Sequence, residues 1–205
     1  MNTKKKYWEK WEEKVLKENK DKDIIELQKL LPLLSVLFLI FGCTSEEPIN
    51  LETKLFEKDG VYYTKDTNTP YSGRVFSLHE NGKKSGEGTL KDGTLDGLYT
   101  TWYDNGQKET KGSFKDEVPD GLYTIWYKNG QKKEEYTFKD GGIDGLSTEW
   151  YENGKKKEEW TLKNMVFDGL YTIWYENGQK KEEKTYKLGK EVSSKEWNED
   201  GSVKE

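Results

Sequence analysis

The stretch GLYTIWYKNGQKKEEYTFKDGGID, residues 121–144, holds two runs rich in Tyr, Thr, Ile and Phe on either side of Asn129-Gly130. Aromatic and β-branched residues favour strands. Asn-Gly tolerates the positive φ angles of a type I′ turn, whose twist matches that of the strands it joins. The stretch therefore predicts a β-hairpin.

The turn also sets the register that we expect between the two strands. If Asn129 and Gly130 are the central turn residues, residues at equal distances from them face each other. The expected pairs are Lys128–Gln131, Tyr127–Lys132, Ile125–Glu134 and Tyr123–Tyr136. Successive side chains point to opposite faces of a strand, so one face is aromatic and the other is mixed. The aromatic face gathers Tyr123, Ile125, Tyr127, Tyr136 and Phe138, and the mixed face Leu122, Thr124, Trp126, Lys133, Glu135 and Thr137.

The same pattern recurs along the chain with a period of 24 residues. The units begin at Gly73, Gly97, Gly121, Gly145 and Gly169, and the first of them is degenerate. A truncated last unit, Glu196–Gly201, is displaced by one residue. A fixed period of this length indicates a tandem-repeat protein in which each unit is stabilised by its neighbours.

The connectors between hairpins decide the fold class. A connector such as Lys139–Gly145 is too short for a crossover helix and carries Asp and Gly for a second turn, so consecutive hairpins must be antiparallel neighbours. We therefore expect an all-β protein, an elongated single-layer antiparallel meander of tandem 24-residue hairpins over residues 73–205. Residues 55–72 are expected to form an N-terminal cap, with a turn at Asp59-Gly60 followed by a strand.

The composition excludes several classes of site. The 205 residues include one Cys and one His, which cannot form an intramolecular disulfide, a multi-cysteine zinc site or a multi-histidine metal centre. A net charge of −5 lacks the basic excess of a nucleic-acid binder. Charged residues make up 36% and aliphatic residues are sparse, which is typical of disorder, but the 13 Tyr and 8 Trp are not. A one-layer sheet wetted on both faces accounts for both facts.

An uncharged run of 13 residues, 30–42, precedes the single cysteine. The run is too short to span a bilayer as a helix, and it matches the apolar core of a signal peptide. It ends in Ile40-Phe41-Gly42-Cys43, which resembles the lipobox of bacterial lipoproteins. The resemblance implies that 1–42 is a signal-peptide region, that Cys43 carries the lipid, and that 43–54 hold this cysteine and a tether. The alternative is a buried free cysteine at the end of a core helix.

The first 26 residues carry mixed charge, whereas the basic start of a signal peptide is usually short. Two interpretations remain open. Translation begins at a non-AUG codon at Leu27, or residues 1–26 are an unusually long cytoplasmic n-region.

The repeated motif Gly-Leu-Tyr-Thr-x-Trp-Tyr-x-Asn-Gly-x-Lys resembles the MORN variant 2 repeat. Together with the lipobox, the Tyr-Tyr-Thr of the cap and the Pro70-Tyr71-Ser72-Gly73 that follows, it looks like the bacterial YwqK-type toxin–antitoxin antitoxin family. The resemblance covers about residues 55–201. It implies an immunity or antitoxin-like binding role, and MORN proteins in general imply scaffolds for protein–protein or membrane association.

The sequence offers little for catalysis. His79 occupies the position held by a tyrosine in the later units, which favours packing over general-base chemistry. Glutamate pairs such as Glu134-Glu135 recur at one repeat position beside lysines, which favours a solvated Lys/Glu ladder over a glycosidase site. Asp-Gly pairs such as Asp59-Gly60 lack the alternating oxygen ligands of a calcium loop and favour turns. We therefore expect no enzyme activity, cofactor or metal.

One repeated aromatic set is a candidate binding surface. It consists of Trp102, Tyr103, Trp126, Tyr127, Trp150, Tyr151, Trp174 and Tyr175. Tyr and Trp are typical interface anchors and also stack on sugar rings. The alternative is that these rings stack on each other and hold neighbouring hairpins together.

The sequence thus predicts a lipid-anchored, non-enzymatic repeat scaffold on the exported side of the bacterial cell envelope. Its expected partner is another protein, either a toxin or an envelope component. The alternative is a glycan or cell-envelope polymer bound by the aromatic rows.

Overall fold

The computed structural model describes residues 47–205, within a compact unit that spans Glu46–Glu205. The predicted signal-peptide region, Cys43 and the start of the tether lie outside the described residues. Between residues 47 and 205, no helix has the length and apolar character needed to cross a membrane.

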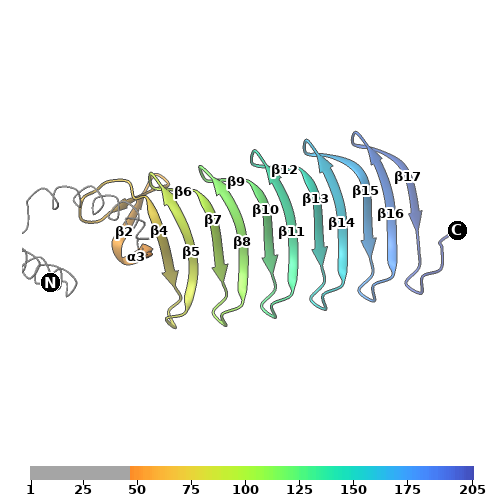
Figure 1. Cartoon of the computed structure of the whole chain (residues 1–205). Coiled ribbons are helices and arrows are strands. Elements are labelled where there is room, and N and C mark those ends of the chain that lie inside the picture. Colours follow the sequence, from red (N-terminus) through yellow and green to blue (C-terminus); the bar gives the residue numbers. More distant parts are fainter. Residues whose placement is uncertain (1–46) are drawn as a thin grey trace, which may run out of the picture. The chain divides into compact units, whose positions relative to one another are not determined.

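From β4 to β17 the described chain is one long antiparallel meander, one layer deep (Figure 1). Each repeat contributes a hairpin that pairs with the hairpins before and after it. The hairpins are β4–β5 (Gly73–Leu78, Lys84–Lys91), β7–β8 (Gly97–Trp102, Lys108–Lys115), β10–β11 (Gly121–Trp126, Lys132–Lys139), β13–β14 (Gly145–Trp150, Lys156–Lys163) and β15–β16 (Val166–Trp174, Lys180–Lys187), followed by β17 (Lys190–Glu196). Short strands β6 (Thr94–Leu95), β9 (Val118–Pro119) and β12 (Gly142–Ile143) pair with β5, β8 and β11. The predicted fold class is confirmed.

The hairpin turns differ from the predicted type. Gly130 has a φ of 85°, but Asn129 does not have a positive φ. The Gly130 N–H donates to the Tyr127 carbonyl, and the Tyr127 N–H donates to the Gln131 carbonyl. This is a type I turn followed by a glycine in the left-handed region, and not the type I′ turn that Asn-Gly predicts. The extra turn residue shifts the register, so Trp126 pairs with Lys132. The predicted pair Tyr127–Lys132 is therefore wrong, whereas the predicted pair Ile125–Glu134 is observed.

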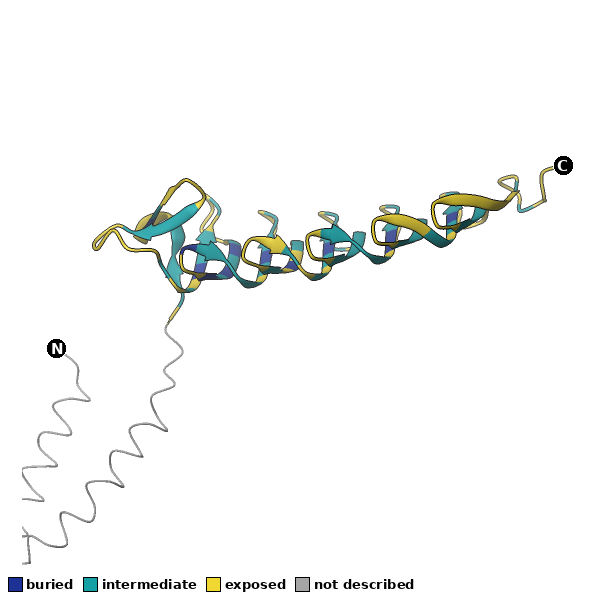
Figure 2. Cartoon of the chain, turned by 90° about the horizontal axis from the view of Figure 1, so that it is seen from above, coloured by how far each residue is buried: buried dark blue, intermediate teal, exposed yellow. Residues whose placement is uncertain are grey.

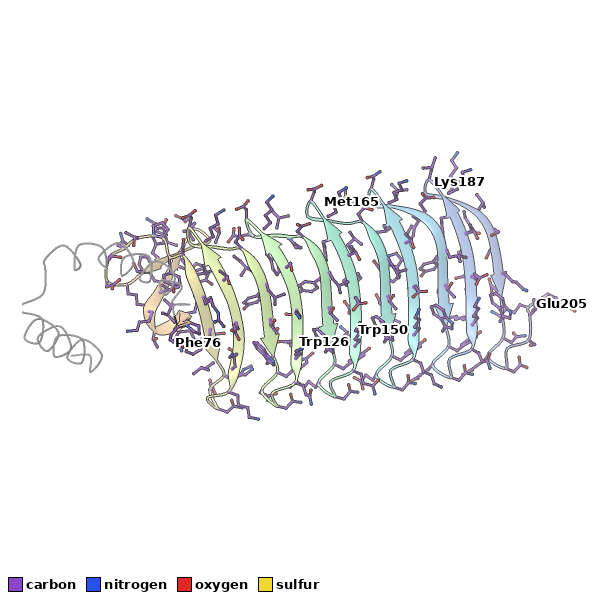
Figure 3. All side chains as sticks on the ribbon, in the orientation of Figure 1. Phe76, Trp126, Trp150, Met165, Lys187 and Glu205 are labelled. Carbon is purple, nitrogen blue, oxygen red and sulfur yellow. The ribbon has the colours of Figure 1, made fainter. Side chains whose placement is uncertain are left out.

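The type I′ geometry occurs instead in the connectors at the opposite edge of the sheet. Both central residues have positive φ at Asp92-Gly93, Asp116-Glu117, Asp140-Gly141, Asn164-Met165 and Leu188-Gly189. These two-residue turns join strands directly, for example through the pair Lys139–Gly142. Figure 3 places Met165 and Lys187 at this connector edge, whereas Trp126 and Trp150 lie toward the Asn-Gly turns.

The cap begins earlier in the chain than the sequence predicts. Strand β1 (Ile49–Asn50) pairs in parallel with β4, and α3 (Leu51–Lys54) follows before the hairpin β2–β3 (Leu55–Lys58, Val61–Thr64). The predicted tether 43–54 therefore loses its last residues to the folded cap. The reason is apolar burial, since Ile49 and Leu51 pack on a core of Leu55, Val75 and Leu90.

Beyond the cap, burial is thin and periodic (Figure 2). On one face the rings of neighbouring strands contact each other, with centroid separations of 5.1 to 6.4 Å. This aromatic face consists of Tyr99, Phe114, Tyr123, Phe138, Tyr136, Trp160, Tyr171, Phe167 and Tyr186. The predicted grouping of Tyr123, Tyr136 and Phe138 on one face is confirmed.

Large and small side chains alternate along the aromatic face. Tyr123 lies against Gly112, where an added Cβ would come within 2.2 Å of the ring. In the next repeat the sizes are reversed, because Ser147 takes the place of the tyrosine and faces Trp160 across the strand pair. Ser147 is 0% exposed, and among the described residues its hydroxyl has no hydrogen-bond partner. In both repeats a large side chain therefore packs beside a small one, but the strand that supplies the large side chain changes.

The buried serine gives the first prediction. Ser147→Ala removes a buried hydroxyl without a partner, so we expect unfolding free energy to stay constant or rise by about 1 kcal/mol. Ser147→Tyr restores the repeat residue but overfills the space, and should cost about 2 kcal/mol or more. Urea denaturation of both variants measures these changes. A clear loss of stability in Ser147→Ala would contradict the assignment.

Candidate binding surface

The four predicted tryptophans lie on the mixed face, near the Asn-Gly turns. Each indole lies under the ammonium group of a lysine from the preceding repeat, with Nζ 5.4 to 5.7 Å from the ring centroid. The pairs are Lys84–Trp102, Lys108–Trp126, Lys132–Trp150 and Lys156–Trp174. At this distance a cation–π interaction links adjacent hairpins.

Most of these lysines also bind a glutamate three residues later in their own strand. The ion pairs are Lys84–Glu87, Lys132–Glu135 and Lys156–Glu159, and Lys180–Glu183 repeats the arrangement. The hydroxyls of the buried Thr124 and Thr148 donate to Glu135 and Glu159 at 3.3 Å. In the first repeat, hydrogen bonds from Lys84 and Arg74 lower the pKa of Glu87 below its usual range. The predicted Lys/Glu ladder is present, with each carboxylate held by a local cation.

Glutamates on the aromatic face accept hydrogen bonds from tyrosines and also form ion pairs with lysines, such as Lys133–Glu134 at 2.9 Å. The Tyr136 hydroxyl donates to Glu134 at 2.9 Å, and the Tyr171 hydroxyl donates to Glu158 at 2.8 Å. Burial and the nearby Glu134 carboxylate raise the pKa of Tyr136 well above its usual range, which keeps this hydroxyl protonated. Among residues 47–205, no three His, Cys, Asp or Glu side chains form a group that could hold a metal ion.

The four predicted tyrosines connect consecutive repeats through their hydroxyls. Each hydroxyl donates to the backbone carbonyl of the tryptophan in the next repeat, at 2.7 to 2.9 Å. The bonds are Tyr103–Trp126, Tyr127–Trp150, Tyr151–Trp174 and Tyr175–Trp197. Each of these rings is only partly buried, and the bond fixes the phenol in place near the Asn-Gly turns.

His79 performs the same function in the degenerate first repeat. Its Nε2 lies 2.7 Å from the Trp102 carbonyl oxygen. A carbonyl only accepts, so Nε2 carries the proton and donates, as the tyrosine hydroxyls do. His79 thus makes the bond that the tyrosines make at the same repeat position.

The turn asparagines form a second row of bonds between repeats. Asn129 accepts the Gln131 N–H on Oδ1 and donates through Nδ2 to the Glu152 carbonyl of the next turn, at 3.0 Å. Asn81, Asn105, Asn153 and Asn177 repeat this bridge. Asparagine therefore serves two purposes at this position, because it shapes its own turn and holds the next one.

The second prediction concerns the bond made by His79. His79→Tyr recreates the repeat residue and should leave the unfolding free energy unchanged within about 0.5 kcal/mol, whereas His79→Phe loses the donor and should cost about 1 kcal/mol. Thermal and urea denaturation of the matched pair measures the difference. Equal stabilities would show that the bond to Trp102 contributes nothing.

The predicted surface residues thus come together as two regular rows that also join the repeats. The expectation that these tryptophans stack on one another is wrong. Each indole contacts a lysine ammonium group, and the ring-to-ring contacts between strands lie on the aromatic face. Tyr99, Phe114, Trp160 and Tyr186 take the repeat positions of Tyr123, Tyr136 and Phe138 on that face, as the period predicts, whereas Phe167 was not predicted there. The sequence signal for this packing is a reciprocal change in side-chain size. One repeat position holds Gly112, Tyr136 and Trp160 in successive units, while another holds Tyr123 and then Ser147.

Comparison with known families matches the hairpin units. The MORN repeat variant matches residues 95–116, 119–140, 143–164 and 167–188. Four segments of this chain are MORN repeat variants. Each matched segment begins in a connector and ends in the next connector turn, so the MORN unit contains one complete hairpin. The degenerate unit at 73 and the last unit lie outside the matched MORN segments. A search of curated proteins gives no match.

Proposed function

We propose that this chain is a non-enzymatic MORN-repeat scaffold that binds another protein, and that a lipid on Cys43 anchors it to the bacterial cell envelope. MORN repeats indicate a repeat scaffold for binding.

The observation that carries the proposal is the uncovered aromatic face. Sheets normally bury one face against a second layer. Within residues 47–205, the strands from β4 to β17 form a single layer, and its rings stay partly exposed, with Phe167 37% exposed. Aromatic side chains with little conformational freedom are enriched in the cores of protein interfaces. A protein partner would supply the missing layer.

The proposed location rests on sequence. The apolar run 30–42 ends in Gly42-Cys43, as in a lipobox, and the polar residues that follow precede the cap. An exported, anchored scaffold would meet partners in the envelope. The finer proposal, drawn from the antitoxin-family resemblance, is that the partner is a toxin and that the scaffold acts as an immunity factor on the exported side.

A second candidate function is favoured by the period of the mixed face. Equivalent tryptophans are two strands apart, roughly 9.6 Å, and each has a lysine beside it. A polymer with a regular repeat and hydroxyl groups, such as an envelope glycan, could contact successive units in the same way. In this case the Trp126 and Trp150 row, and not the aromatic face, would carry binding.

The third prediction separates these candidates. The tagged full chain is compared with Phe167→Ser/Tyr186→Ser on the aromatic face, and with Leu188→Ser, an exposed turn residue, as control. We expect a stoichiometric envelope protein to bind the wild type and the control, and the double variant to bind at least about tenfold more weakly. Affinity capture followed by titration with the purified partner measures this. Retention on cell-wall polysaccharide that Trp126→Ala abolishes, with no protein partner, would favour glycan binding instead.

The fourth prediction tests the anchor. Cys43→Ser removes the thiol that the lipid modifies, so the chain should leave the membrane fraction and appear in the soluble fraction. Fractionation with immunoblotting measures the distribution, and metabolic labelling with a palmitate analogue reports the lipid. A labelled Cys43→Ser chain, or one fully retained on membranes, would refute anchoring through this residue.

A further inference from the structure

We propose that the mixed face joins two copies of this chain face to face, through a row of exposed leucines. The row consists of Leu98, Leu122, Leu146 and Leu170, one at the same position of each matched MORN unit. These side chains are 50 to 55% exposed. Leucines exposed at the same position of four successive units form a regular row of apolar side chains, and a grouped set of exposed apolar residues of this kind is a candidate interaction site.

The row alternates large and small side chains. Across each hairpin the leucine pairs with a serine or threonine, in the pairs Leu98–Ser113, Leu122–Thr137, Leu146–Thr161 and Leu170–Thr185. Along the sheet, leucines therefore stand roughly 9.6 Å apart with a small residue halfway between them. Such a surface fits a partner whose large residues have the same period and fill the intervals. A second copy has this period in every unit.

The charges beside the row favour a like face as the partner. Lysines of the mixed face form ion pairs within their own strand, as in Lys132–Glu135 and Lys156–Glu159. The hairpins β10–β11, β13–β14 and β15–β16 thus compensate much of the lysine charge on this face, which reduces like-charge repulsion between two such faces. In β7–β8, Lys108 and Lys111 form no ion pair among the described residues.

The size and shape of the face suit a dimer. Figure 1 shows the strands from β7 to β16 side by side in one regular array, so the leucine row extends over four successive units. Eight strands at about 4.8 Å, each roughly 20 Å long, give about 770 Å² on each copy. A standard stable interface takes about 800 Å² from each partner.

Symmetry fixes how the copies would meet. A closed dimer of two faces needs a two-fold axis in the plane between them. An axis along the leucine row would match the rows but leave the two sheets overlapping only near their connector edges, so full overlap of the faces requires an axis along the strands. This axis reverses the order of the repeats. With leucines seated opposite Ser113, Thr137, Thr161 and Thr185, Leu170 of one copy lies between Leu98 and Leu122 of the other. This register also leaves Arg74 beyond the last strand of the second copy, so its charge is not buried.

The fifth prediction tests this geometry by cross-linking. Leu98→Cys and Leu170→Cys are each placed in the full chain with Cys43→Ser, carry different tags, and are purified in a mild detergent. A short bis-maleimide should not cross-link two copies of the same variant, because identical positions stand roughly 24 to 34 Å apart along the row. The mixture should give a covalent heterodimer. Because no other protein is present, this result does not depend on the proposed partner.

Association is measured separately by light scattering. Leu122→Asn/Leu146→Asn should raise the dissociation constant of the dimer at least tenfold, whereas Val118→Asn/Leu188→Asn, exposed at the connector edge, should leave it unchanged. Circular dichroism checks that both variants fold. The proposal is overturned if the mixture gives no heterodimer, if each cysteine variant cross-links to itself as efficiently, or if both double variants associate alike.

Discussion

A hydrogen bond that leaves one repeat and ends in the next holds this sheet together. Neighbouring hairpins share few paired backbone positions; β8 and β10 meet at Thr124–Lys111 and Ile125–Thr110. Since no second layer covers the strands from β7 to β17, the side chains must supply the rest. The tyrosine hydroxyl, the asparagine amide and the lysine over the indole each cross one junction between hairpins. High charge and few aliphatic residues are compatible with folding because the stabilising contacts are largely polar and local.

The same constraint explains why the two faces differ. On the aromatic face, rings pack edge to face and glutamates accept tyrosine hydroxyls, which makes a surface that is rigid and still partly exposed. On the mixed face, ion pairs and buried threonines occupy the middle of the strands, while the leucines near the connector edge are exposed. One sheet can therefore present two chemically distinct surfaces, each with the period of the repeat.

Much of the fold was predictable from the sequence, since the period, the hairpins and the antiparallel order follow from the spacing of Gly97, Gly121 and Gly145 and from short connectors. The turn type was not. Asn-Gly favours type I′ when considered alone, but Asn129 must also reach the Glu152 carbonyl, a contact in the next repeat. Strand β1 escaped notice because two residues carry no periodicity, and their position depends on the core formed by Leu55 and Val75. The sequence also identified the tryptophan and tyrosine rows of the candidate surface. It did not reveal their hydrogen bonds and cation–π contacts, because these depend on how adjacent hairpins pair.

The bond from Tyr127 to Trp150 has a donor and an acceptor 23 residues apart, and the same offset recurs from His79 to Tyr151, before the displaced last unit shortens it to 22. Any unit can therefore follow any other, because each carries the donor for its successor and the acceptor for its predecessor. Insertion or loss of one whole unit recreates the same junction, and the Ser147–Trp160 exchange shows that a unit can change its interior while its ends stay fixed. Length is thus a variable that evolution can adjust in steps of one hairpin, without redesigning the protein.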